Sequence, residues 1–107
     1  MNANALISAA DGGKVVLGDN VMIGPNVVLR ASDHVFNDTK IPMREQGHVG
    51  GNIILGDDVW VGANSIILKG VKISNGTILG ANSLLNISTE ENDIYAGSPA
   101  KKISTRK

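Results

Sequence analysis

Aliphatic residues recur along this chain with a period of six. From Leu17 an Ile, Leu or Val occupies every sixth position until the pattern breaks after Leu29, and the series resumes at Val49. Its members are Leu17, Ile23, Leu29, Val49, Leu55, Val61, Ile67, Ile73, Leu79 and Leu85. A short fixed period is typical of a solenoid, in which each repeat packs on its neighbours.

Two further positions of the hexad are also restricted in residue type. Glycine follows the aliphatic residue at positions 18, 24, 50, 56, 62 and 80. Glycine suits a corner where a side chain would clash or where φ must be unusual. Three residues after the glycine position, small or β-branched residues recur at Val21, Val27, Ile53, Val59, Ser65, Val71, Thr77, Ser83 and Thr89. Asp33 alone breaks this second series, which suits the pleated surface of strands.

Helices and hairpins fit this pattern poorly. A helix needs apolar spacing near 3.6 residues, and glycines inside it would each cost roughly 1 kcal/mol relative to alanine. A hairpin array would show alternation with turn signals every ~8 to 12 residues. The pattern therefore predicts an all-β coil of short strands that stack at the usual ~4.8 Å spacing.

One interruption separates the two runs of repeats. The 20 positions from Leu29 to Val49 are not a multiple of six, so the phase is lost and regained. If the hexad 29–34 is complete, residues 35–48 form an excursion with the sequence VFNDTKIPMREQGH, next to His34 and ending at His48. Loops of this length in compact domains are usually functional.

Length and composition limit the classes of function. A chain of 107 residues fits one domain, 1–107, and is short enough that association with other subunits is expected. Lys plus Arg equals Asp plus Glu at ten each, so no overall field favours nucleic acid. Cysteine is absent, which excludes a disulfide framework and a thiolate metal site. Residues 1–10 lack a basic segment and a long apolar stretch, and no apolar run approaches ~20 residues, so we expect a cytoplasmic protein without membrane insertion.

The repeats resemble those of a known family. The runs LGDNVMIGPNVVL and LGDDVWVGANSIILKGVKISNGTILGANS resemble the [LIV]-G-x-x-x-x repeats of the left-handed β-helix acyltransferases. The resemblance implies a left-handed, three-sided parallel β-helix with coils of about 18 residues. Leu55 would then stack on Ile73 and Val61 on Leu79, while Val49, Ile67 and Leu85 would form the third ladder. The domain would comprise a degenerate first coil (1–16), repeats (17–34 and 49–90), the loop (35–48), and a cap with a basic tail (91–107).

Within that family, the chain resembles the branch of galactoside, maltose and polysaccharide-biosynthesis O-acetyltransferases. The segments DHVF, DDVWVGANSIILKGVKI and AGSPAKKI carry this resemblance, which covers nearly the entire chain. It implies an enzyme that transfers an acetyl group from acetyl-CoA to a hydroxyl of a sugar or sugar-derived acceptor. It also implies a homotrimer with active sites between subunits and no metal.

His34 occupies the position of the family's catalytic histidine. A neutral imidazole, with an unperturbed pKa near ~6.5, can take the proton of an attacking hydroxyl. The alternative is a histidine that is merely hydrogen-bonded in a loop. Asp33 should point to the opposite face of an extended segment from His34. Glu45 could fold back toward His34, and His48 has no assigned role.

The resemblance also implies a set of binding residues. Contacts to CoA would come from Trp60, Ala63, Ala81, Asn86, Lys101 and Arg106, and an acceptor contact from Asn4. The family often has Thr-Lys where this chain has Asn86-Ile87, so one basic contact is missing. Trp60 could instead pack at a subunit interface, and the basic residues could form a solvated tail.

Two alternative functions remain open from the sequence. The first is an inactive scaffold or CoA-binding module, because the N-terminal part is short and the Thr-Lys pair is missing. The second is a metalloenzyme resembling the γ-carbonic anhydrases. Catalytic zinc sites use three protein ligands, whereas this chain has two histidines and no cysteine.

Overall fold

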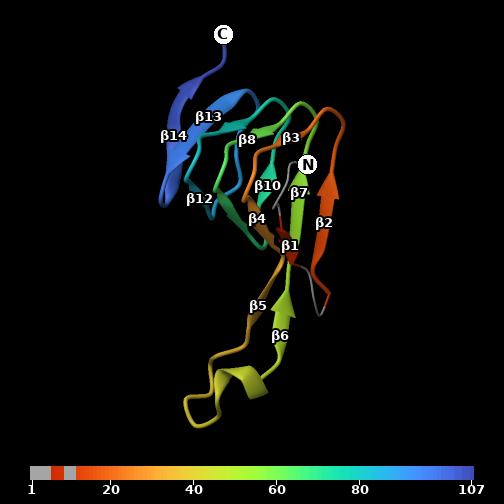
Figure 1. Ribbon diagram of the computed structural model, residues 1–107, viewed down its shortest axis with the longest axis vertical. Coiled ribbons are helices and arrows are strands. Elements are labelled where there is room, and N and C mark those ends of the chain that lie inside the picture. The colour runs from red at the N-terminus through yellow and green to blue at the C-terminus, as the bar shows by residue number, and fades with distance from the viewer. Residues whose placement is uncertain (1–5, 9–11) are drawn as a thin grey trace.

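The chain folds as a left-handed parallel β-helix with a hairpin that projects from its side (Figure 1). The structure is a computed structural model and describes residues 6–8 and 12–107. Within that part of the chain the only helical segment is the single 3-10 turn η1, Met43–Glu45. No helix in these described residues is long and apolar enough to cross a membrane.

Three sheets form the sides of the helix, and successive coils add one short strand to each sheet, except that the last coil adds none to the second sheet. The first sheet contains β1 (Leu6–Ser8), β4 (Val28–Arg30), β9 (Ile66–Leu68) and β12 (Leu84–Leu85). The second contains β2 (Lys14–Leu17), β7 (Asn52–Leu55) and β10 (Lys72–Ile73). The third contains β3 (Met22–Ile23), β8 (Trp60–Val61), β11 (Ile78–Leu79), β13 (Asp93–Gly97) and β14 (Ala100–Thr105).

The core consists of the aliphatic ladders that the six-residue period predicts. Leu55 pairs with Ile73, Val61 with Leu79 and Ile67 with Leu85, always one coil of 18 residues apart. All six of these side chains are at most 1% exposed. Each buried aliphatic side chain of this size stabilises the fold by roughly 1.5–3 kcal/mol relative to exposure. The period therefore predicted both the coil length and the interior.

One ladder assignment was wrong. Val49 does not join Ile67 and Leu85, since Leu29 is the partner of Ile67 in the first sheet. Val49 lies instead in β6 (His48–Gly50), opposite Asp33 of β5 (Ser32–His34), and is 46% exposed. β5 and β6 are antiparallel, so Val49-Gly50 has the aliphatic-glycine signature without being a repeat.

The excursion is consequently longer than the predicted 35–48. The coil closes where the Gly51 N–H donates to the Ala31 carbonyl at 2.8 Å, and the chain between them leaves the helix. His34 is therefore part of the projecting hairpin and does not end a completed hexad. This also explains why Asp33 breaks the series of small and β-branched residues.

The last strands cap the solenoid. β13 pairs in parallel with β11, and β14 folds back antiparallel on β13. The buried Asp93 carboxylate accepts a hydrogen bond from Thr105 Oγ1 at 2.9 Å and lies 3.3 Å from Lys102 Nζ. The Arg106 guanidinium donates hydrogen bonds to residues of two successive coils. Its Nη1 lies 3.2 Å from the Asp58 carboxylate and 3.1 Å from the Gly76 carbonyl oxygen.

Candidate functional site

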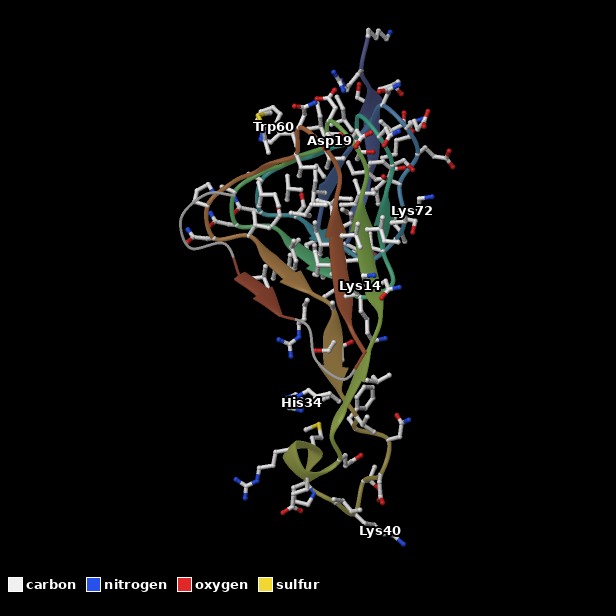
Figure 2. All side chains as sticks on the ribbon, turned by 90° about the vertical axis from the view of Figure 1, so that its right-hand side faces the viewer. Lys14, Asp19, His34, Lys40, Trp60 and Lys72 are labelled. Atoms are coloured by element: carbon white, nitrogen blue, oxygen red, sulfur yellow. The ribbon has the colours of Figure 1, made fainter. Side chains whose placement is uncertain are left out.

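His34 ends the first strand of the projecting hairpin, opposite His48. The two residues are direct partners in the antiparallel pairing of β5 with β6. Their ring centroids are 4.3 Å apart and the rings are tilted by 36°. Both side chains are exposed, so the pair is open to a ligand. Figure 2 shows His34 on the hairpin, well below the coils of the solenoid.

The two acidic residues considered near His34, Asp33 and Glu45, make contacts with other residues. The Asp33 carboxylate lies 3.5 Å from Arg30 Nε and 3.9 Å from Lys69 Nζ, in line with the expected alternation of faces along a strand. Glu45 lies in η1 with an exposed side chain, and its backbone N–H donates to the Pro42 carbonyl at 2.9 Å. His34 instead has a ring contact with His48, a residue without an assigned role in the sequence analysis.

The Gln46 side chain stabilises the loop beyond the two histidines through hydrogen bonds. The sequence analysis did not identify this role. Its side-chain Nε2 donates to the carbonyls of Asp38 and Ile41, both at 2.7 Å. Its Oε1 accepts from the Asp38 backbone N–H at 3.2 Å. One amide thus satisfies three backbone groups of an excursion that lies outside the core.

A separate pocket of about 460 Å³ opens at the corner that follows the third sheet. Its lining residues are mostly small or apolar: Gly24, Pro25, Trp60, Gly62, Ala63, Ile78, Leu79, Gly80 and Ala81. Three of the predicted CoA contacts, Trp60, Ala63 and Ala81, are thereby brought together. The short side chains at this corner leave the space, and Trp60, 50% exposed, forms a wall.

The other predicted binding residues lie outside that lining. Asn86 is exposed directly after β12. Lys101 is exposed in β14 opposite Ala96, a residue that lies close to Gly80 of the pocket corner. Arg106 is held at another corner through Asp58 and Gly76. Asn4 lies outside the described residues.

Within one chain the pocket and the histidine pair are far apart. In Figure 2 the labels of Trp60 and His34 lie toward opposite ends of the longest axis. The hairpin departs from the first sheet, whereas the pocket lies at the corner beyond the third. Among residues 6–8 and 12–107, no group of three or more His, Cys, Asp or Glu side chains is placed to hold a metal ion.

Comparison with known proteins identifies the class of protein to which the six-residue repeat belongs. Residues 52–86 match the family model described as bacterial transferase hexapeptide (six repeats). This part of the chain is thus a hexapeptide-repeat segment of the bacterial transferase type. The resemblance to hexapeptide-repeat acyltransferases that the sequence predicts is confirmed.

Individual relatives are named as acyltransferases. Galactoside O-acetyltransferase of Escherichia coli is 32% identical over 102 residues, which are 94% of this chain and 49% of that protein. AntD, an N-acyltransferase from Bacillus cereus solved with an amino sugar nucleotide and CoA, is 29% identical with a TM-score of 0.84, over 98% of this chain and 59% of AntD.

A hexapeptide-repeat acetyltransferase of Vibrio cholerae, solved with acetyl-CoA, is 28% identical with a TM-score of 0.85. The match covers 97% of this chain and 55% of that one. The chain spans half or less of the length of the curated relatives that it matches.

Proposed function

We propose that this chain is the β-helix domain of a CoA-dependent acetyltransferase that acts on a hydroxyl of a sugar or sugar-derived acceptor. The observation that carries the proposal is the pocket beside Trp60, in a fold shared with an acetyltransferase solved with acetyl-CoA. In this proposal His34 is the general base, and acetyl-CoA is the donor.

The pocket suits the narrow pantetheine arm of CoA. Ala63 and Ala81 line one corner on successive coils, where a larger side chain would occupy the space. Trp60 and Ile78 give the arm an apolar wall. Asn86 and Lys101 would contact more distant parts of CoA, and a lysine there could pair with a phosphate. Arg106 would do so only by leaving Asp58.

The chemistry requires one proton acceptor. The acceptor oxygen attacks the thioester carbonyl, and the His34 imidazole takes the hydroxyl proton as the C–O bond forms. The C–S bond then breaks, and the imidazolium returns the proton to the leaving thiolate of CoA. No covalent enzyme intermediate is needed. An imidazole that is exposed at the side of the solenoid is accessible to an acceptor.

The distance between His34 and the pocket indicates that the active site needs two subunits. One chain cannot place its own His34 beside a thiol bound at Trp60, because the two are widely separated along the longest axis of the molecule (Figure 2). The hairpin projects from the side of the solenoid (Figure 1), where the pocket of a second copy could meet it. We therefore propose the homotrimer that the family resemblance implies, and a cyclic assembly would repeat one such hairpin-to-pocket contact in every subunit.

A second acceptor class has specific support. AntD, with the same fold, is an N-acyltransferase solved with an amino sugar nucleotide. An amine is therefore the alternative nucleophile for this chain, with the same donor. Asn4, outside the described residues, stays a proposed acceptor contact.

The decisive test is acetyl transfer with and without His34. Thiol release from acetyl-CoA is measured with panels of sugars and amino sugars, and His34→Ala should lower kcat by about 10²- to 10⁴-fold. Circular dichroism and thermal unfolding should be unchanged, since the side chain is exposed on the hairpin. Undiminished transfer in His34→Ala would remove His34 from the mechanism.

Calorimetry separates the enzyme from the inactive scaffold. The proposed enzyme binds CoA at the Trp60 pocket, and Ala81→Trp should abolish that binding by filling the space. If the unaltered protein showed no CoA binding at millimolar concentration, the scaffold function would be favoured. CoA binding without transfer to any hydroxyl or amine would instead support a CoA-binding module.

A further inference from the structure

We propose that His48 is a positioning residue for His34, and that it acts through contact between the two rings. This inference rests on the proposed role of His34 as general base. Sequence alone assigns His48 no role, and 14 positions separate it from His34 along the chain. Strand pairing removes that separation and makes the two residues direct partners across β5 and β6.

The geometry of the pair supports a packing contact. The ring centroids are 4.3 Å apart and the rings are tilted by 36°, so the two rings are in direct contact and each limits the orientations open to the other.

His34 needs such support because of its position. It is the last residue of a three-residue strand that stands clear of the coils, and its side chain is exposed. An exposed imidazole has several rotamers available, whereas a general base must be held within about 10–20° of its productive orientation. Asp33 does not supply this restraint, since its carboxylate is paired with Arg30 and Lys69.

The proposal distinguishes the ring of His48 from its nitrogen atoms. Removal of the ring in His48→Ala should lower kcat about ten- to hundredfold, since small displacements of a catalytic group can cost about 10²-fold. The KM for acetyl-CoA should change little, because His48 orients the base and is not part of the lining of the proposed donor pocket. His48→Phe keeps an aromatic surface and should retain kcat within about threefold of the unaltered protein.

A matched control tests for general damage to the hairpin. Val49 is the next residue of β6, is 46% exposed, and pairs with Asp33 on the other face of the strand. Val49→Ala is therefore expected to keep kcat near that of the unaltered protein. Loss of activity in Val49→Ala comparable to that in His48→Ala would overturn a specific role for the ring.

The ring contact itself is measured by NMR, independently of catalysis. The imidazole protons of His34 should shift in His48→Ala and stay close to their original positions in His48→Phe, because a ring current persists.

If His34→Ala is inactive but His48→Ala has normal kcat, the positioning role is wrong and the general base stands. If His34→Ala is fully active, the proposed function itself fails. If His48→Phe is as inactive as His48→Ala, the nitrogen atoms of His48 matter and positioning by the ring is overturned.

Discussion

At the scale of single residues, each corner of the coil needs a residue that tolerates positive φ and a residue that lets the next coil approach closely. Different residue types meet these two needs. The left-handed backbone conformation is taken mostly by Asn and Asp: Asn20, Asn26, Asp58, Asn64, Asn82 and Asn92 have φ between 55° and 60°. These residues tolerate that region better than other residues with a side chain. The glycine of the hexad instead allows close approach of the next coil. At Gly24, an added Cβ would lie 2.8 Å from the Ala63 backbone nitrogen.

Alanine at Gly62 should therefore destabilise the fold through a steric clash. Its Cβ would lie 2.5 Å from the backbone nitrogen of Ala81, and backbone of a packed coil cannot move aside cheaply. We expect a loss of about 1–3 kcal/mol in the free energy of unfolding, typical of overpacking, measured by urea denaturation.

Gly80→Ala is the matched control for this prediction. Gly80 occupies the same hexad position one coil later, but its nearest obstacle is the Ala96 Cβ at 3.1 Å. The coil above it is shorter, since Ile78 pairs with Ile94. The loss at Gly80 should be clearly smaller, and equal losses at both sites would contradict the clash as the cause.

At the scale of elements, the hairpin is held by side chains that no period reveals. Repeats could be predicted because each hexad faces the same environment and selects the same residues. The boundary of the hairpin could not, because Val49-Gly50 looks like a repeat and only strand pairing shows otherwise. The polar Asp33 in a series of small residues was the one available sign. The pairing of His34 with His48 and the hydrogen bonds of Gln46 depend on the conformation of the excursion, which has no periodicity.

Gln46→Ala should loosen the loop without unfolding the solenoid. It removes the three hydrogen bonds that join Gln46 to Asp38 and Ile41. Each bond contributes roughly 0.5–1.5 kcal/mol locally, whereas the core lies elsewhere. Amide hydrogen exchange should accelerate at the Asp38 N–H, with little change in the global unfolding midpoint.

Arg44→Ala is the control for Gln46, since Arg44 is exposed in η1 of the same loop. Its exchange pattern should match that of the unaltered protein. If Gln46→Ala left exchange at the Asp38 N–H unchanged, the side-chain amide would not be what orders this segment.

At the scale of the whole molecule, the solenoid keeps its two candidate sites apart. The outward side chains of the third sheet include Met22, 59% exposed, and Trp60, 50% exposed, which stack on successive coils. Ile66, 38% exposed, lies on the outside of the first sheet. Apolar residues on an outer surface favour association between copies. In the proposed trimer, association would also bring the hairpin of one copy to the pocket of another, so that activity would depend on assembly.

Mixing two inactive variants should restore activity if each site is shared between subunits. His34→Ala lacks the proposed base, and Ala81→Trp lacks space for the donor, so each should be inactive by itself. After unfolding and refolding together in equal amounts, some sites combine the intact His34 of one subunit with the intact pocket of its neighbour. Random assortment in a cyclic assembly gives such sites about one quarter of the time.

Thiol release from acetyl-CoA by the refolded mixture would then approach about a quarter of the rate of refolded unaltered protein. A mixture refolded from His34→Ala alone is the control for incomplete inactivation. If each chain carried its own complete site, no combination of the two variants could produce an intact one, and the mixture would stay as inactive as its components. Recovery in the mixture would therefore show that the hairpin of one subunit serves the pocket of the next.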